Sequence, residues 1–414
     1  MGAVPEKSSL GKLVVLMVTA FMDMVGVLMV VPLLPFFVTD MGAGGLVVGL
    51  LVSSFSVAQL LMAPVWGRLS DHYGRRPALL IGMAASAISF VIFAFANSLW
   101  LLFVMRLVQG AGGGTVSVIQ AYVADALEPK DRAKGLGWLS AATNAGVALG
   151  PVLGGVALTL MGRRGPGLLA AGLCLINIAF MWRYLRESRD MTEAAESRSK
   201  PKVPGRSRQA VWRVASHPAE PASRLIWIYA IAIGAFQGIT PIFALYLGLR
   251  YGVTAHTIGY FFAYIGIISV VARALILGKA VDYFGEARLA RFGSTLLALG
   301  LALLPFMRPA ANPLLTYVPL ALAVALLPLG TAFTFPCVTA LLSRVVPSTE
   351  RGLYMGVQQT FGGASRVIFP IVYGFLFDRV VEAPFLLGAA LVVFTIYLGR
   401  GMASIAAQAE AKPA

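Results

Sequence analysis

The sequence predicts an all-α integral membrane protein in which twelve transmembrane helices form two pseudo-symmetric six-helix bundles. Of its 414 residues, 58% are hydrophobic and 12% are charged, whereas a soluble domain is about 25% charged. The mean hydropathy is +0.81. The apolar residues also fall into runs of about 20, the length that crosses a bilayer. These observations exclude a soluble globular protein, a disordered chain and a disulfide-stapled secreted module.

Each apolar run is expected to be a helix, because a backbone in lipid must satisfy its own hydrogen bonds and these runs are too long for barrel strands. The first run is too long for a signal peptide and lacks a cleavage pattern, so it is a retained span. The first bundle, residues 1–184, is expected to hold Leu13–Val38, Leu46–Trp66, Ala78–Ala96, Trp100–Tyr122, Gly135–Leu158 and Gly167–Tyr184. The second, residues 225–414, is expected to hold Leu225–Leu249, Thr257–Leu277, Leu289–Met307, Leu314–Val338, Leu353–Phe377 and Pro384–Met402.

The basic residues predict the orientation in the membrane. The net charge is +15, which could indicate nucleic-acid binding, but the few solvated segments favour topology instead, so no nucleic-acid partner is expected. Alternate loops carry Arg68, Arg75, Arg76, Lys130, Arg132, Lys134, Lys279, Arg288, Arg291, Arg344 and Arg351, against Arg163, Arg164, Arg250, Arg308 and Arg379 opposite. The richer side is expected to be cytoplasmic, and the even number of spans places both termini there.

Residues 185–224 are expected to be a cytoplasmic linker between the bundles. Their stretch SRSKPKVPGRSRQ is dense in Arg, Lys, Ser and Pro, a composition that predicts a mobile tether without a core. A second possibility is that the linker rests on anionic membrane lipid.

The two halves also repeat each other. GRLSDHYGRR (67–76) is echoed by GKAVDYFGEA (278–287), and PKDRAKGLG (129–137) by PSTERGLYMG (347–356). Parallel six-helix repeats joined by a cytoplasmic linker are typical of a rocking transporter with a midplane site.

Four motifs then resemble one family. They are GRLSDHYGRRP after the second span, DMVGVLMVVPLLP (23–35), RLVQGAGGG (106–114) and GVALGPVLGG (146–155). They are similar to those of the major facilitator superfamily, specifically its twelve-helix tetracycline and multidrug exporters. The resemblance implies a secondary transporter of the plasma (inner) membrane, a monomer without cofactor, that exports a small molecule in exchange for protons.

The first motif has a physical reading as a cytoplasmic gate. Gly67 and Gly74 allow a tight reversal between two helices, and Arg75 and Arg76 mark the cytoplasmic face. Asp71 is expected to face the positively charged N-terminus of the eleventh helix and so to close that side. The resemblance implies that Arg75 pairs with Asp125. The alternative is a turn whose solvated charges only set topology.

The helix 5 motif has a packing role. Gly146, Gly150 and Gly154 recur every fourth residue and form a small-residue stripe that lets two helices approach closely. Pro151 adds a bend, and Gly155 completes the motif. The resemblance adds a second role, in which this helix blocks leak.

Ionisable residues inside the bilayer are costly and therefore candidates for function. Asp23 is the one acidic residue near the middle of a predicted span, and a carboxylate there can bind a proton when dry and release it when wet. Arg106, with Gln109 on the same helical face, stays charged and is expected to tune that acid. The alternative is that Asp23 and Arg106 form a permanent structural pair.

The second half supplies the expected substrate contacts. Arg366 lies at the centre of the eleventh span, with Gln358 and Gln359 on preceding turns; Asn144 and Gln237 are further candidates. Two arginines against one carboxylate favour anionic, zwitterionic or chelating amphiphiles. The amides could equally be hydrogen bonds between helices.

No enzyme motif or metal site is expected. The sequence has no phosphate-binding loop, HExxH or GxSxG in a suitable context, and Cys174 and Cys337 lie in apolar runs. The expected partners are a small-molecule substrate, protons and membrane lipid. Two rival functions remain: a proton symporter for an organic anion, and a lipid or lysolipid translocator.

Overall fold

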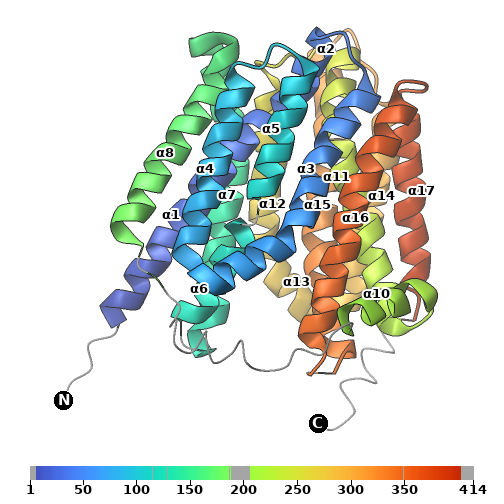
Figure 1. The fold of residues 1–414 in the computed structure, drawn as a ribbon. Coiled ribbons are helices and arrows are strands. Elements are labelled where there is room, and N and C mark those ends of the chain that lie inside the picture. Colours follow the sequence, from blue (N-terminus) through green and yellow to red (C-terminus); the bar gives the residue numbers. More distant parts are fainter. Residues whose placement is uncertain are drawn as a thin grey trace, which may run out of the picture. The chain divides into compact units, whose positions relative to one another are not determined.

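The computed structural model describes residues 6–113, 115–127, 129–185, 187, 206–347 and 349–401. These residues form helices and turns, with no strand among them (Figure 1). Nine helical stretches in this described part are long and apolar enough to cross a membrane, and one of them, Gly135–Tyr184, is 50 residues long and contains two helices. The all-helical membrane class is confirmed, and the count of twelve spans stays a prediction.

Contacts divide the chain into two units. The first comprises Met1–Met41, Ser54–Lys202 and Thr254–Gly266; the second comprises Gly42–Ser53, Val203–Val253 and Ile267–Ala414. Two helices, α3 (Gly45–Tyr73) and α12 (Ile258–Val271), therefore contribute to both units. The division into residues 1–184, 185–224 and 225–414 stays a prediction.

In the first unit, α1 packs along α7 and α8, and α4 packs along α5 and α8. Long apolar side chains such as Leu16, Met29 and Phe90 fill the space between these helices. Its further elements are α1 (Glu6–Val30), η1 (Val31–Leu33), α2 (Leu34–Asp40), α4 (Arg75–Ala94), α5 (Leu99–Gly112), α6 (Thr115–Ala126), α7 (Pro129–Met161), η2 (Gly162–Arg164) and α8 (Gly165–Tyr184).

In the second unit, α11 packs along α16 and α17, and α14 packs along α15 and α17. Tyr246 is buried here, and its hydroxyl donates to Leu304 O at 2.6 Å. Its further elements are α10 (Arg206–Ser216), α11 (Pro221–Tyr251), the π-helical η3 (Ala272–Ile276), α13 (Leu277–Phe284), α14 (Glu286–Leu303), η4 (Leu304–Phe306), α15 (Pro313–Val345), α16 (Arg351–Phe377) and α17 (Ala383–Leu398).

The predicted linker differs from expectation in its last part. Residues 206–216 form the helix α10 (Figure 1), and Ala210 and Val214 are buried in a hydrophobic cluster of the second unit. These two residues are one helical turn apart, so one face of a mostly polar helix is apolar. The average composition of the linker is polar and therefore did not indicate this apolar face. Residues 186 and 188–205 lie outside the described part of the chain.

The predicted span Trp100–Tyr122 is two helices rather than one. Helix α5 ends at Gly112 and α6 begins at Thr115. The sequence between Gly110 and Gly114 is GAGGG, and glycine costs about 1 kcal/mol per residue in a helix relative to alanine. The glycine run therefore weakens the helix at this point, which the apolar pattern did not reveal.

Candidate functional site

The break between α5 and α6 lies beside the buried carboxylate of α1. Asp23 is 4% exposed, and Thr115 Oγ1 donates a hydrogen bond to its Oδ2 at 3.3 Å. Thr115 is the first residue of α6, so the carboxylate lies at the N-terminal end of that helix. The unpaired N–H groups of a helix start favour a negative charge. The sequence identified Asp23 as a candidate but did not place a helix end beside it.

The carbonyl groups that the break releases are bound by side chains of α3. Gln59 Nε2 donates to Gly113 O at 3.1 Å, and Trp66 Nε1 donates to Ala111 O. A broken helix in a membrane protein persists where neighbouring groups satisfy its backbone. The side chains of α3 therefore stabilise the break between α5 and α6.

Arg106 and Gln109 form another buried polar group in this unit. They are 3% and 2% exposed, and Arg106 Nη1 donates to Gln109 Oε1 at 2.6 Å. The guanidinium carbon lies 4.5 Å from the centroid of the Phe55 ring. Gln109 Nε2 is buried without a hydrogen-bond partner among the described residues. An unpaired buried donor is costly and is suited to an incoming acceptor.

The predicted gate residues lie around the junction of α3 and α4 and at the end of α6. Arg75 Nε donates to Asp125 Oδ2 at 2.9 Å, and Arg75 Nη1 donates to Asp71 Oδ1 at 3.1 Å. The ion pair implied by the resemblance is thus present in the structure. Gly67 lies within α3, and Gly74 adopts a positive φ of 99° before α4. The contact of Asp71 with the start of the eleventh helix stays a prediction.

Glu187, which follows α8, also contacts the start of α4, and the sequence did not single it out. Its carboxylate accepts hydrogen bonds from the backbone N–H of Arg75 at 2.8 Å and of Arg76 at 3.0 Å. Arg76 Nη2 also donates to Trp182 O at 2.6 Å. Glu187 therefore caps the N-terminus of α4. Because 111 or more residues separate it from that helix start, no local motif could indicate the contact.

The glycine stripe of α7 lies against α1. A Cβ on Gly146 would lie 2.6 Å from Phe21 O, and one on Gly150 would lie 2.8 Å from Val25 O. A Cβ on Gly154 would overlap the backbone of Met29. Backbone contact this close excludes any side chain, which agrees with the predicted packing role.

Gly155 and Pro151 face a different neighbour. A Cβ on Gly155 would lie 3.0 Å from His256 O, and one on Gly259 at the start of α12 would overlap Pro151 O. Pro151 itself lies inside α7. The helix therefore packs closely on two sides, of which the sequence motif suggested one.

The predicted substrate residues of the second unit differ in their surroundings. Arg366 is half-buried on α16, and its buried Nε has no hydrogen-bond partner among the residues described. Gln358 is fully buried and lies within 3.4 Å of Thr339 Oγ1. Gln237 and Gln359 are exposed. In the first unit, Asn144 Nδ2 donates to Ser140 O in its own helix at 2.8 Å, so that amide has an intrahelical role.

Asp378, after the end of α16, is a further residue that the sequence did not single out. Its carboxylate accepts hydrogen bonds from Gly45 N at 2.6 Å and Leu46 N at 2.8 Å, at the start of α3. Farther along the same contact, Ser53 Oγ donates to Val367 O at 2.6 Å. A Cβ on Gly49 would overlap the backbone of Pro370. Within the second unit, α3 and α16 thus touch backbone to backbone, and Asp378 caps the contact.

Comparisons with known proteins agree with this architecture. The family model described as Major Facilitator Superfamily matches residues 16–370 and 274–402. Multidrug resistance protein 1 of Bacillus subtilis (strain 168) is 26% identical over 387 residues, which cover 93% of this chain and 95% of that protein. Tetracycline resistance protein, class C, of Escherichia coli is 29% identical over 375 residues, which cover 87% and 88% of the two proteins.

A solved structure shows the same fold. The crystal structure of a D-xylose-proton symporter superimposes with a TM-score of 0.73 at 16% identity, over 96% of this chain and 98% of that one. The family model spans most of the chain, and the family and its fold are those of membrane transporters. The chain, a multi-pass membrane protein, therefore belongs to the Major Facilitator Superfamily.

Proposed function

We propose that this protein is a proton-coupled exporter of amphipathic small molecules, which works by alternating access as a monomer in the plasma membrane. The observation that carries the proposal is the buried carboxylate of Asp23, which lies beside Thr115 at the start of α6. A carboxylate inside a membrane span is costly, and its presence there therefore points to a function. The two relatives named above are a multidrug and a tetracycline resistance protein, which supports export as the direction of transport.

The geometry suggests how a proton is held at Asp23. When the carboxylate is ionised, the Thr115 hydroxyl and the helix start of α6 stabilise its charge. When the surroundings become dry, burial favours the protonated, neutral form. Alternation between wet and dry surroundings therefore loads and unloads the proton. Arg106 stays charged and, hydrogen-bonded to Gln109, supplies a fixed positive field in the same unit.

Two unpaired donors support an anionic or zwitterionic cargo. Gln109 Nε2 and Arg366 Nε are buried polar atoms without a hydrogen-bond partner in the described part of the chain. Each of these donors suits a carboxylate or phosphate oxygen, and guanidinium binds such groups with two parallel hydrogen bonds. A lipophilic monocation would leave both donors unsatisfied.

The close helix contacts support a gate on the face predicted to be exterior. In the second unit the start of α3 lies on α16 at Asp378, and in the first unit the start of α12 lies on α7 at Pro151. We propose that both contacts open when the exterior face opens. Glycine-lined contacts without interlocking side chains can separate and re-form without trapping a rotamer. Asp378 would then be the exterior counterpart of Asp71.

The test is transport by the purified protein in liposomes with an imposed pH gradient, with tetracycline as the first probe. Wild-type protein should accumulate the probe when the gradient favours export. Asp23→Asn keeps size and hydrogen bonding but cannot titrate, so gradient-driven accumulation should vanish while exchange of labelled for unlabelled probe persists. Glu220→Gln, a change at a carboxylate that pairs with Arg213, is the matched control and should behave as wild type.

Two outcomes would contradict the proposal. Well-folded Asp23→Asn that still concentrates the probe on a pH gradient would assign the proton to another group. Accumulation of an organic anion in the direction of the proton flux, rather than against it, would instead identify a symporter. That rival has one structural argument, the unpaired Nε of Arg366.

A further inference from the structure

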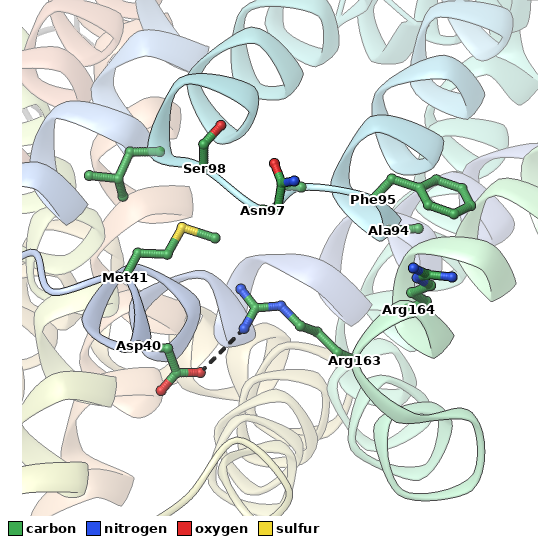
Figure 2. Close-up of a pocket in the computed structure, with 10 residues that line it drawn as sticks. Asp40, Met41, Ala94, Phe95, Asn97, Ser98, Arg163 and Arg164 are labelled. Atoms are coloured by element: carbon green, nitrogen blue, oxygen red, sulfur yellow. Dashed lines mark ion pairs between the residues drawn. The ribbon is translucent and has the colours of Figure 1, made fainter.

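A pocket of about 690 Å³ lies at one end of the first unit (Figure 2). It is formed where α2 ends, where α4 connects to α5, and at the short helix η2. Helix α4 begins at Arg75, beside the predicted gate, and ends at Ala94, on the pocket wall. Its 20 residues span about 30 Å at 1.5 Å per residue, so the pocket and the residues around Asp71 lie at opposite ends of a helix long enough to cross a membrane.

Two consecutive arginines give the pocket its charge. Arg163 and Arg164 lie in η2 and line the pocket together with Asp40. An aromatic ring holds each guanidinium: that of Arg163 lies 4.5 Å from the centroid of Phe37, and that of Arg164 lies 5.0 Å from the centroid of Phe95. Cation–π contact limits the freedom of a side chain that is otherwise mobile. The two charges are therefore positioned before any ligand arrives.

Asp40 neutralises only part of this charge. Its Oδ2 lies 3.7 Å from Arg163 Nη1, beyond hydrogen-bond distance, and the two side chains are 61% and 45% exposed. Figure 2 shows Arg163 reaching across the pocket toward Asp40, while Arg164 lies beside Phe95. An exposed ion pair of this length is weak. The pocket thus keeps a net positive charge, and a stronger anion can replace Asp40.

The rest of the lining indicates the kind of ligand. Asn97 and Ser98 supply neutral polar groups, whereas Met41, Phe95 and Leu99 supply apolar surface. A small inorganic anion would use the arginines and leave this apolar surface wet. An amphiphile with one phosphate or carboxylate group and a short apolar body would use both. Arginine also suits these two groups, because its fork of N–H donors matches their oxygen atoms.

We propose that this pocket binds the anionic head of an amphiphile through Arg163 and Arg164. The site is separate from the Asp23 and Arg106 groups, and binding there requires no proton coupling. Two sources share the chemistry: the head group of an anionic phospholipid, and a soluble organic anion at the membrane surface. The proposal can therefore fail or succeed independently of the proposed transport function.

The test measures equilibrium binding of octyl phosphate to the full-length protein in a neutral detergent, with octyltrimethylammonium as the cationic counterpart. Octyl phosphate should bind with saturation, and octyltrimethylammonium should not. Arg164→Gln should weaken octyl phosphate binding about tenfold, because a hydrogen bond to a charged group is lost. Asp40→Asn should strengthen it by about threefold, because the competing carboxylate becomes neutral. Opposite changes from two neighbouring residues would not follow from loss of folding.

The matched control is Arg379→Gln. Arg379 is an exposed arginine stacked over Phe375 at 3.5 Å, and it is not part of the pocket lining. It should leave octyl phosphate binding unchanged. The proposal is overturned if Arg379→Gln weakens binding as much as Arg164→Gln, or if Asp40→Asn and Arg164→Gln change it in the same direction. Unchanged binding in folded Arg164→Gln and Asp40→Asn would also overturn it.

A second arm separates the two sources. The protein is placed in nanodiscs of phosphatidylcholine, with or without phosphatidylglycerol, and octyl phosphate binding is measured again. If phosphatidylglycerol competes in wild type and competes less in Arg164→Gln, the pocket takes a lipid head group. If octyl phosphate binds equally in both nanodiscs and still depends on Arg164, the ligand is a soluble anion. If binding depends on neither phosphatidylglycerol nor Arg164, the pocket is not an anion site.

Discussion

Replacement of Asp378 by alanine should open the contact between α3 and α16. The carboxylate accepts two backbone hydrogen bonds, at 2.6 and 2.8 Å, from the first residues of α3. Alanine removes both acceptors and leaves the start of a 29-residue helix uncapped on that side. The glycine contacts deeper in the interface would remain, so the variant should still fold.

The expected size of the effect follows from the exposure of the residue. Loss of an N-terminal cap costs about 0.5–2 kcal/mol, and interaction with the helix dipole at an exposed site contributes about 0.3–1 kcal/mol. Asp378 is exposed, so solvent screens the charge and a value near 1 kcal/mol is appropriate. That free energy corresponds to about a fivefold increase in the open population. Asp378→Asn keeps an acceptor of equal capping strength and should lose less.

The assay is the rate at which an impermeant thiol reagent modifies a cysteine beneath the contact. Ser53 is suited to this, because it is 2% exposed and lies against α16. The cysteine replaces Ser53 in a background without Cys174 and Cys337, which are both buried. When opening is fast relative to modification, the rate is proportional to the open population, so Asp378→Ala should react about fivefold faster.

A neighbouring carboxylate provides the control. Glu382 pairs with Arg250 rather than with a helix start, so Glu382→Gln should not accelerate modification of position 53. Equal rates in wild type and Asp378→Ala would refute the idea that Asp378 holds the start of α3 against α16. So would acceleration by Glu382→Gln of the same size, since any loss of negative charge would then suffice.

Three further results are expected. Arg366→Gln should weaken binding of an anionic probe by about tenfold or more, because a hydrogen bond to a charged group is lost, and binding of a neutral analogue should not change. Titrations with both probes measure this, and equal losses of affinity would indicate a structural role. Gly150→Ala should lower the free energy of unfolding by about 1–3 kcal/mol through overpacking against Val25 and Leu28. Gly137 lies in the same helix, but a Cβ added there would have no neighbouring atom outside its own helix backbone within 4 Å. Gly137→Ala should therefore be neutral or stabilising in thermal unfolding. Glu187→Ala should destabilise the start of α4 by about 1 kcal/mol, seen as faster hydrogen exchange of the amides of Arg75 and Arg76, and unchanged exchange would show that Glu187 is not a cap.

The helical fold could be predicted because it depends on local composition. A run of about 20 apolar residues has few alternatives to a membrane helix, and the positions of Asp23, Arg106 and Arg366 inside such runs follow directly. The glycine stripe was predictable for the same reason, since its spacing of four residues places Gly146, Gly150 and Gly154 on one face.

Helix interruptions were harder to predict. The run GAGGG marks the end of α5, but glycine is common in membrane helices, so its presence alone does not indicate a break. The break depends on Gln59 and Trp66 of α3, which bind the released carbonyl groups. Helix α10 illustrates the opposite error, because its average composition is polar whereas its inward face, Ala210 and Val214, is not.

The residues that sequence reasoning missed, Glu187 and Asp378, share one property. Each is a carboxylate that caps the start of a helix far away in the chain, 112 residues from Arg75 and 333 residues from Gly45. Such a contact leaves no periodicity or local motif, because the helix start offers only backbone N–H groups, which every sequence has.

A carboxylate bound to the start of a distant helix is suited to a helix contact that opens and closes. A helix start presents several N–H donors in a cluster, so a carboxylate can bind there without a specific partner side chain. When the contact separates, water satisfies both the donors and the carboxylate, and the net cost is about 1 kcal/mol rather than the several that a buried ion pair would require. At Asp378 the donors belong to the start of α3 and the acceptor follows the end of α16. In the proposed exterior gate, a contact of this strength would bias the equilibrium between two states and could be reversed by one bound substrate.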